Sequence, residues 1–371
     1  MKKKLVIAGG GHAHMLTLSR LSSFVEAGYE VNVIGPSEYH YYSGMGPGML
    51  GNTYSPEEVR FATKTVAEKM GATFTLGSVR QIDPVRQMVY LDSGDELPYD
   101  VLSCNLGSQV PNNLTVGPQD DVFLVKPIEE LLYARKRIMK LGLLKKISVG
   151  GVGSGTSAVE IAGNIWRLGQ EPGMNPIEII LFAGNQLLPH YPDGVRRLAY
   201  NSLRKRDIRI EENCRVQSVE TGRVVSDASS SYGLDIIFVA VGISPSKVFR
   251  ESGIPTGPDG GMLVNRYLQS PAHPTIFGGG DCIYFAAAPL DKLGVYAVRQ
   301  NPVIYHNLQA ALRCTELQVF VPGGRRYLQI FNMGDDTGIF YKRPFLFSGN
   351  GSFRLKNYID RKFMKRYQAL E

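Results

Sequence analysis

The chain contains the same local pattern twice: an apolar segment, a glycine-rich turn and an amphipathic segment. The first copy is Leu5–Gly11, followed by a helix expected over Met15–Glu26, and the second is Ile147–Gly155, with a helix expected to about Leu168. A strand, a glycine turn and a helix in this order form the context in which Gly-x-Gly indicates dinucleotide binding. Two copies therefore predict two similar nucleotide-binding units that arose by internal duplication.

Each glycine of these turns has an expected task. Gly9 allows the tight turn, and Gly11 lets the backbone approach a pyrophosphate held by the N–H groups of the helix start. In the second copy, Gly153 and Gly155 are followed by Ala158, which still permits close packing of helix on strand. A Walker-type phosphate loop is excluded because no Gly-Lys-Ser/Thr follows.

Neither copy carries the acidic residue that normally ends the next strand and binds ribose hydroxyls. Gly35-Pro36 follows the first such strand, and Glu38 is either a substitute or a solvated loop charge. Ala183-Gly184-Asn185 follows the second, without an acid and without an arginine directly after it. The choice between NADH and NADPH therefore stays open.

Other segments complete the expected element order. Tyr39–Met49 is rich in glycine and aromatic residues, so we expect a loop that contacts a planar ligand or lies on the surface. Ser55-Pro56 starts a helix expected to reach Met70, and Lys126-Pro127 opens one to Lys140. Further strands are expected at Thr73–Leu76, Gln87–Leu91, Val101–Asn105, Glu178–Phe182 and Leu234–Gly242.

A third glycine-rich turn, Gly278–Gly280, follows the apolar residues Thr275–Phe277 and leads into Asp281. The carboxylate of Asp281 can accept hydrogen bonds from a sugar alcohol chain. A simple turn without a ligand is the alternative.

Composition narrows the function classes. The 371 residues are 43% hydrophobic and 20% charged, as in an ordinary globular protein of two domains. The net charge of +7 favours anionic ligands or an acidic partner surface. We expect free thiols and no metal site, because the cysteines stand far apart and the His12/His14 pair sits in a glycine turn. The cysteines are Cys104, Cys214, Cys282 and Cys314.

The opening Met1-Lys2-Lys3-Lys4 imitates a signal peptide, but the apolar run behind it is short and ends in glycines. We therefore expect no signal peptide. No apolar run reaches the roughly 18 residues that a membrane-spanning helix needs.

Four motifs, in this order and spacing, resemble the two-dinucleotide-domain flavoproteins of the pyridine nucleotide-disulfide oxidoreductase superfamily. They are Gly9-x-Gly11, Gly153-x-Gly155-x-x-Ala158-x-Glu160, Val239–Gly242 and Ile276–Asp281. Further segments resemble type II NADH dehydrogenases and, more closely, the flavoprotein module found alone or fused to selenide, water dikinases. These segments are Gly9–His14, Tyr42–Gly48, Val125–Pro127, Gly294–Pro302 and Ile359–Met364.

The resemblance implies FAD on the first unit and NADH or NADPH as co-substrate on the second. The residues it implies for FAD are Gly9, Gly11, His12, Ala13, Glu38, Ser43, Gly44, Gly107, Gly280, Asp281 and Ala297. For NAD(P) they are Gly153, Gly155, Thr156, Ala158 and Gly242. As catalytic residues it implies Lys126 near the flavin, Glu160, and Gln300 near the quinone pocket.

The chain departs from the superfamily at two points. His14 stands where the first fingerprint usually has a third small residue. No redox cysteine pair lies on the helix after that fingerprint, so we expect no disulfide reductase activity, and the cysteine pattern of sulfide:quinone oxidoreductases is not matched. We expect an FAD-dependent NAD(P)H dehydrogenase that passes electrons to quinone or a similar acceptor. A flavin-bearing sensor or partner protein tied to selenium metabolism, and a flavoenzyme with a donor such as sulfide, remain alternatives.

The expected fold is α/β, with two doubly wound three-layer (ββα-type) domains, the second inserted in the first, plus a small C-terminal segment. The expected boundaries are 1–111 and 246–320 for the FAD-binding domain, 112–245 for the NAD(P)-binding domain, and 321–371 for the C-terminal segment.

The segment Ser352–Gln368 carries six positive charges against one acid, Asp360, with apolar residues near helical spacing. It predicts a basic amphipathic helix that lies on an anionic membrane surface or packs on the first domain. We expect a cytoplasmic protein, peripheral on the inner face of the membrane in the former case. No nucleic-acid partner is expected, and a homodimer is left open.

Overall fold

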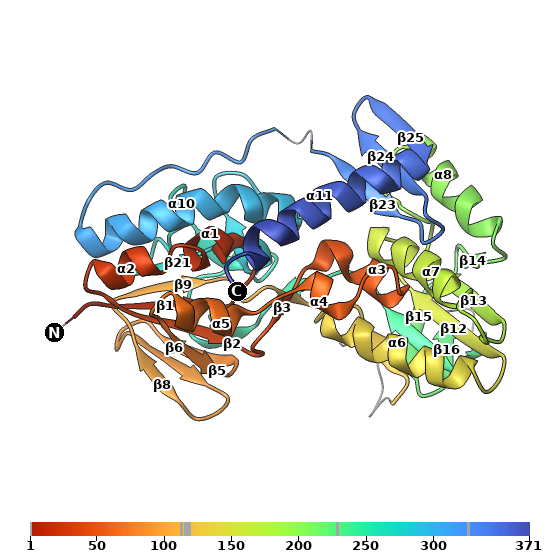
Figure 1. The fold of residues 1–371 in the computed structure, drawn as a ribbon, viewed down its shortest axis with the longest axis horizontal. Helices are drawn as coiled ribbons and strands as arrows, with labels where there is room; N and C mark the ends of the chain where they lie inside the picture. The colour runs from red at the N-terminus through yellow and green to blue at the C-terminus, as the bar shows by residue number, and fades with distance from the viewer. Residues whose placement is uncertain (1, 112–113, 115–119, 228–229, 325–326) are drawn as a thin grey trace.

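The computed structural model describes residues 2–111, 114, 120–227, 230–324 and 327–371. Two five-stranded parallel sheets organise them, one in each half of the molecule (Figure 1). In order across the first sheet, its strands are β21 (Ile276–Gly278), β9 (Val101–Cys104), β1 (Lys4–Ala8), β2 (Glu30–Gly35) and β5 (Thr73–Leu76). Those of the second are β11 (Val122–Leu124), β18 (Ile236–Val239), β12 (Ile147–Val152), β13 (Ile177–Phe182) and β14 (Arg209–Glu211).

The two sheets share one topology. In each, the strand before the glycine turn lies in the centre, between the next strand of its unit and an Asp-led strand, β9 or β18. β21 follows the whole second unit in sequence yet pairs with β9, so the second unit is inserted in the first. The sheets confirm the predicted α/β class with duplicated, doubly wound units.

The central strands are buried along nearly their whole length. Leu5, Ile7 and all four residues of β18 are fully covered, which is typical of parallel strands with layers on both faces. On the first sheet, α10 (Gly294–Arg313) packs beside η1 (His12–His14) and α1 (Met15–Leu18). In the second unit, α7 (Thr156–Leu168) packs on β12 and β13.

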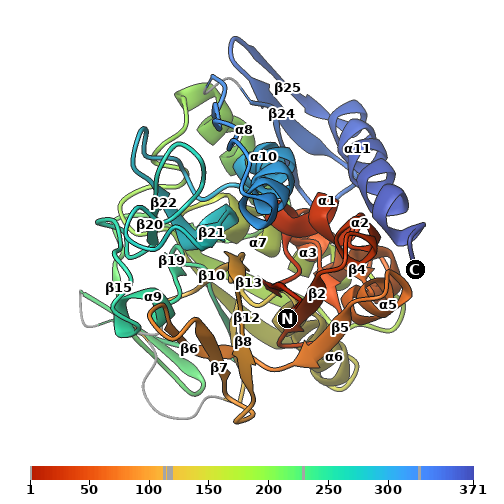
Figure 2. The same ribbon diagram turned by 90° about the vertical axis from the view of Figure 1, so that its left-hand side faces the viewer.

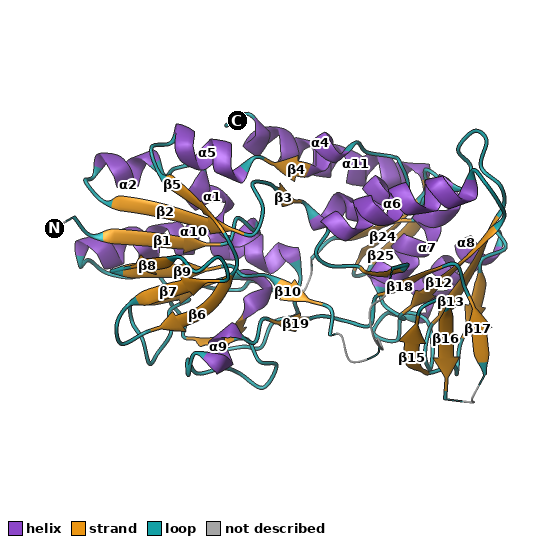
Figure 3. Ribbon diagram, turned by 90° about the horizontal axis from the view of Figure 1, so that it is seen from below, coloured by secondary structure: helices purple, strands orange, loops and turns teal. Residues whose placement is uncertain are grey.

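A small antiparallel sheet forms the third layer of each unit. In the first unit it lies on the far side of the parallel sheet from α10 (Figure 2). Its strands are β6 (Val79–Asp83), β7 (Met88–Leu91) and β8 (Glu96–Pro98). The matching strands of the second unit are β15 (Val216–Glu220), β16 (Arg223–Ser226) and β17 (Ser231–Gly233). The units are joined by β10 (Ser108–Gln109) and β19 (Ser244–Pro245), which pair antiparallel between them (Figure 3).

The predicted single helix Met15–Glu26 is wrong: two short helices, α1 and α2 (Ser22–Glu26), replace it. The break falls at Ser19, whose hydroxyl donates to the carbonyl of Leu16 at 2.8 Å. Such a bond from side chain to backbone competes with continuation of the helix.

The predicted helix from Ser55 to Met70 is also interrupted. Ser55 and Glu58 form the expected capping box, but the helix they start, α4 (Pro56–Val59), is only one turn long. Its successors are β4 (Arg60–Phe61), which pairs with β3 (His40–Tyr41), and α5 (Thr63–Lys69). The strand pairing takes the backbone groups that a continuous helix would have used.

Ordered elements replace most of the predicted loop Tyr39–Met49. After β3, the chain forms η2 (Ser43–Met45) and α3 (Gly46–Leu50), with Pro47 in the first turn of α3. Every residue of α3 is buried, and the glycines allow close packing. A Cβ on Gly48, for example, would lie 2.4 Å from the ring of Tyr54.

The C-terminal segment forms a sheet of β23 (Gln329–Asn332), β24 (Gly338–Lys342) and β25 (Phe345–Gly349), followed by α11 (Asn350–Gln368). α11 packs on this sheet and on α4 and β4 of the first unit, so it extends from the C-terminal sheet to the middle of the molecule (Figure 1). None of the helices in the described part of the chain has the length and apolar character needed to cross a bilayer. The remaining elements are α6 (Glu129–Gly142), α8 (Asp193–Arg204), α9 (Val248–Glu251), β20 (Met262–Val264), η3 (Gly280–Cys282) and β22 (Ile283–Phe285).

Candidate functional site

A cavity of about 1190 Å³ lies between the two units, and both glycine turns line it. It exceeds the roughly 300–1,000 Å³ of an ordinary ligand pocket, so it has room for more than one small ligand. The predicted site residues that line it are Gly9, Gly11, His12, Ser43, Gly44, Gly107, Lys126, Gly153, Gly155, Thr156, Glu160, Gly242, Gly280, Asp281 and Ala297.

In the first turn, the glycines permit close packing on Asn105. Gly9 has φ +95°, and a Cβ there would lie 2.2 Å from the Asn105 carbonyl oxygen. A Cβ on Gly11 would lie 2.6 Å from the side-chain amide nitrogen of Asn105. That amide nitrogen is buried without a hydrogen-bond partner among the described residues.

The second turn is more open. Gly153 has φ +148°, and a Cβ on it would meet the carbonyl oxygen of Ala240 at 2.3 Å, so no other residue fits there. Around Gly155, in contrast, no atom of the described residues lies within 4 Å of an added Cβ. Gly155 is also the N-cap of α7, and no side chain caps this 13-residue helix. Its first N–H groups are thus available to an anion in the cavity.

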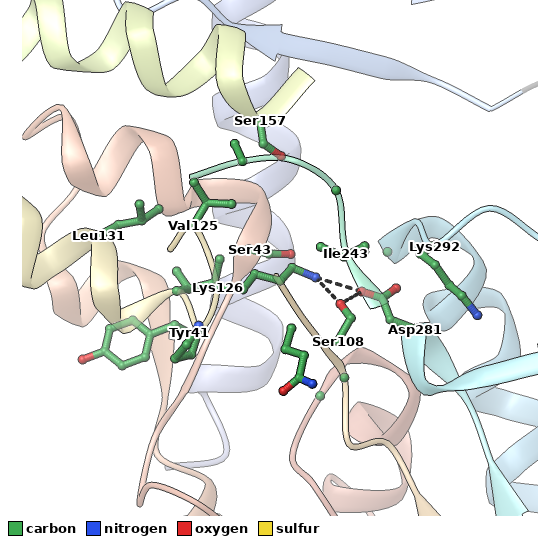
Figure 4. A pocket seen from close by; sticks show the side chains of 18 of the residues that line it. Tyr41, Ser43, Ser108, Val125, Lys126, Leu131, Ser157, Ile243, Asp281 and Lys292 are labelled. Atoms are coloured by element: carbon green, nitrogen blue, oxygen red, sulfur yellow. Dashed lines mark hydrogen bonds and ion pairs between the residues drawn. The ribbon is translucent and has the colours of Figure 1, made fainter. Parts of the chain in front are cut away.

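Lys126, Asp281 and Ser108 form a polar cluster on the cavity wall (Figure 4). The Lys126 ammonium donates to Asp281 and to the Ser108 hydroxyl at 2.8 Å each, and that hydroxyl donates to Asp281 at 2.7 Å. Burial raises the pKa of Asp281, but the charge and hydrogen bonds of its two neighbours outweigh burial and leave that pKa below its usual value. The carboxylate therefore stays ionised and keeps acceptor capacity for hydroxyl groups.

A second buried cluster links the cavity to α11. Glu160 lines the cavity and accepts a hydrogen bond from the backbone N–H of Asn332 at 2.7 Å. Burial raises the pKa of Glu160 to about 7, although the charge of Lys356 opposes the rise. Lys356 donates to the Gly44 carbonyl at 2.8 Å and to Asp360 at 2.7 Å.

The same helix also packs against His12, a residue of the cavity lining. Tyr42 donates to Asp360 at 3.1 Å, and Phe363 stacks on His12 with ring centroids 5.7 Å apart. The sequence predicts Lys356 and Phe363 on a basic amphipathic helix that lies on a membrane surface or packs on the first domain. The spacing of Lys356 and Asp360, four apart on one helical face, was the available signal for an ion pair.

His14 has a structural explanation. Its Nδ1 lies 2.6 Å from the Gly9 carbonyl and its Nε2 lies 2.8 Å from the Ser103 hydroxyl. Because a carbonyl only accepts, Nδ1 carries the proton and Nε2 accepts from Ser103. Burial lowers the pKa of His14 to about 4, so the ring is neutral and braces the glycine turn.

Four predicted site residues do not line this cavity: Ala13, Glu38, Ala158 and Gln300. Ala13 and Ala158 are buried in packing contacts. Glu38 pairs with Lys64 at 2.7 Å on the surface, the solvated alternative. Gln300 accepts from the Gly280 N–H at 2.7 Å and lines a much smaller cavity beside Asp281.

Known proteins resemble this chain in sequence and in structure. The family model described as pyridine nucleotide-disulphide oxidoreductase matches residues 3–311. NADH dehydrogenase-like protein YutJ of Bacillus subtilis is 24% identical, with 78% of this chain and 79% of that protein covered. Type II NADH:quinone oxidoreductase of Staphylococcus saprophyticus is 24% identical over 97% of this chain and 94% of its own. The structure of NDH2 from Plasmodium falciparum in complex with NADH superposes with a TM-score of 0.80 at 14% identity, covering 99% of both chains.

Proposed function

The chain belongs to the pyridine nucleotide-disulphide oxidoreductase family, and we propose that it is an FAD-dependent NAD(P)H dehydrogenase that passes electrons to a quinone or a similar small acceptor. One observation carries the proposal: a single cavity is lined by both glycine turns. A hydride donor on the second unit and a flavin on the first would share that cavity. The names of the two curated relatives support a dehydrogenase, and one of them names quinone as acceptor.

The residues of the first unit fit FAD. Three buried polar atoms that line or border the cavity have no hydrogen-bond partner among the described residues: Asn105 Nδ2, His40 Nε2 and Thr63 Oγ1. Atoms of this kind are costly unless a ligand or water satisfies them. The Gly9–Gly11 turn would hold the pyrophosphate and Asp281 the sugar alcohol chain. A bound flavin would accept a hydride and return the electrons to an acceptor.

Lys126 and Glu160 are the proposed catalytic residues from this chain. Lys126 keeps a positive charge on the cavity wall, held in place by Asp281 and Ser108. Such a fixed cation stabilises negative charge that develops nearby. Glu160, with its pKa raised to about 7, exchanges a proton at its carboxyl group near neutral pH. Reduction of a quinone consumes protons, which gives Glu160 its proposed task.

Cysteine chemistry is a weaker candidate for the same cavity. Cys104 and Cys282 are fully buried, and burial raises both thiol pKa values, that of Cys282 to about 11. Thiols of this kind are poor nucleophiles at neutral pH, because the thiolate is the reactive form. This argues against a sulfide donor that works through these cysteines, and favours the nicotinamide donor.

We propose domain limits at the boundaries expected from the sequence. We also propose that the C-terminal segment, 321–371, faces the membrane. The outer face of α11 exposes Leu355, Tyr358 and Ile359 beside four basic residues. The basic residues are Arg354, Lys362, Lys365 and Arg366. An apolar strip flanked by cations suits an anionic membrane surface, where a quinone would be found.

Anaerobic titration of the FAD-loaded protein with NADH and then NADPH tests the function. We expect loss of the flavin absorbance near ~450 nm, a general property of flavins, at about one equivalent of donor, and its recovery on addition of a soluble quinone. A yellow protein that neither nucleotide reduces would refute the dehydrogenase proposal.

A further inference from the structure

The end of strand β13 is joined to a distant part of the second unit. Gly184, two residues beyond β13, forms an isolated antiparallel bridge with Cys214, whose N–H donates to the Gly184 carbonyl at 3.0 Å. Arg215 follows directly, so the bridge fixes an arginine beside the residues that come after β13. The local sequence after β13 does not reveal this arginine, because it stands 31 positions after Gly184.

This region faces the large cavity. Phe182, Ala183, Gly184, His190 and Arg215 all line it. They lie next to the second glycine turn, because the N–H of Leu188 donates to the Ser154 carbonyl at 2.7 Å. In doubly wound units the residues after the second strand meet the ribose of the bound dinucleotide.

Arg215 supplies a positive charge at this end of the cavity. Arg215 and His190 are both exposed. The acidic residues among the described cavity lining are Glu129, Glu160 and Asp281, and none of them belongs to the segment after β13. Two carboxylates close to this segment lie outside the cavity lining. Glu212 accepts from the backbone N–H of Leu187 at 2.7 Å, and Asp227 accepts from the backbone N–H of Arg215 at 3.3 Å.

The second unit therefore lacks a ribose-binding acid and has an arginine, Arg215, in the same region. A carboxylate after the second strand accepts hydrogen bonds from the free 2′-hydroxyl of NADH, whereas an arginine nearby accommodates the 2′-phosphate of NADPH. Here Ala183, Gly184 and Asn185, which follow β13, offer no carboxylate, and among the described residues no atom lies within 4 Å of a Cβ added at Gly184. Arg215 brings a guanidinium, which matches phosphate geometry through paired N–H donors.

We propose that Arg215, assisted by His190, binds the 2′-phosphate of the adenosine ribose, so that NADPH is the preferred donor. The preference for NADPH in turnover rests on the proposed function. Binding of the 2′-phosphate at Arg215 does not require that activity. It can therefore be measured without hydride transfer.

Binding of nucleotide fragments tests the phosphate site separately from hydride transfer. Calorimetric titration of the FAD-loaded protein with 2′,5′-ADP and with 5′-AMP compares ligands that differ in the 2′-phosphate. We expect 2′,5′-ADP to bind roughly ten- to a hundredfold more tightly, the range of hydrogen bonds to charged groups. Arg215→Ala should remove most of this ratio. Arg223→Ala, which removes an exposed arginine paired with Glu220 in the small sheet that begins directly after Arg215, should leave this ratio unchanged.

Introducing a carboxylate after β13 provides the converse test. Gly184 has φ +62°, a conformation that aspartate tolerates better than most residues, and its Cβ position is open. Gly184→Asp should lower the affinity for 2′,5′-ADP and shift the ratio of kcat/KM values toward NADH by at least about tenfold.

The outcomes are distinguishable. If NADH reduces the flavin but 2′,5′-ADP binds no more tightly than 5′-AMP, the phosphate site is refuted and the dehydrogenase stands. If neither NADH nor NADPH reduces the flavin, yet 2′,5′-ADP binds more tightly and Arg215→Ala abolishes the difference, the site stands and the dehydrogenase proposal fails. Equal loss of the ratio in Arg223→Ala would overturn the assignment to Arg215.

Discussion

The ammonium group of Lys356 lies 2.8 Å from the carbonyl oxygen of Gly44, across 312 positions of sequence. Gly44 lines the cavity and Lys356 lies on α11, outside the residues that the family model matches. The helix thus braces the cavity wall from behind, through a bond to backbone that does not depend on the residue type at position 44.

Lys356→Met should destabilise the protein and loosen its flavin. The substitution removes the bond to Gly44 and leaves Asp360, which is 4% exposed, without its ion-pair partner. Breaking a buried pair from one side costs about 3–5 kcal/mol. Denaturant unfolding and the FAD retained after gel filtration measure the effect. Lys362→Met, at an exposed position of the same helix, is the control; equal losses in both variants would contradict a specific brace.

Glu160→Gln should remove a pH dependence between about 4.5 and 7. The unfolded carboxyl titrates near 4.5 and the folded one near 7, so the folded state holds the extra proton between these values. Wild-type stability contributed by this group therefore falls as pH rises through that window, and Glu160→Gln should not show the fall. In turnover, we expect the wild-type inflection near pH 7 to vanish in the variant.

The inflection near pH 7 in the pH dependence of turnover also tests whether the charge of Lys356 acts on Glu160. Because the charge of Lys356 lowers the pKa of Glu160, Lys356→Met should move the inflection above 7. An unmoved inflection in a folded, FAD-loaded Lys356→Met protein would show that the two groups are not coupled.

His14→Gln should make the protein less sensitive to acid. Burial lowers the pKa of His14 from 6.5 to about 4, so the unfolded state gains its proton first as pH falls. The stability that His14 contributes is complete above pH 6.5 and is lost progressively down to about 4. Free energies of unfolding at pH 7 and pH 4.5 should differ less in the variant than in the wild type. An identical difference would argue that the ring is protonated in the fold.

Asp281→Asn should reduce FAD retention while the fold persists. The amide keeps the shape but leaves Lys126 without its carboxylate at 2.8 Å, and it weakens the hydrogen bonds proposed for the sugar alcohol chain. We expect at least a tenfold rise in the Kd of FAD, measured by flavin fluorescence. Asp95→Asn, at an exposed turn, should not change it. Full retention in Asp281→Asn would remove this residue from the proposed site.

The outer face of α11 can be tested with vesicles. Tyr358 is 62% exposed and Ile359 41% exposed, so Tyr358→Glu combined with Ile359→Glu should spare the fold. We expect the double variant to lose co-sedimentation with vesicles rich in anionic lipid, since it removes apolar area and adds negative charge. Turnover with a water-soluble quinone should be unchanged. Equal sedimentation of wild type and variant would place membrane contact elsewhere or exclude it.

The sequence predicts the parallel strands and α7 well because burial there is continuous and local. Ile147 to Val152 and Ile177 to Phe182 are apolar runs that end at glycine turns, and nothing distant is needed to recognise them. Both of the duplicated glycine turns, which the sequence predicts between a strand and a helix, line the cavity.

The remaining elements depend on contacts that the local pattern does not contain. Ser19 breaks a helix through one bond to Leu16, and Arg60-Phe61 leaves a helix to pair with His40-Tyr41. Lys356 looks like one charge among many until Gly44 and Asp360 are placed beside it. Likewise, the bridge between Gly184 and Cys214 brings Arg215 to a strand end where the sequence shows no arginine.

The brace from α11 also has a consequence for the order of assembly during translation. Gly44 leaves the ribosome long before Lys356, which is synthesised 312 positions later. Both nucleotide-binding units can therefore form their sheets while the wall at Gly44 is still unsupported. Flavin captured by a nascent chain would exchange readily, and tight retention would begin only once α11 has emerged and docked.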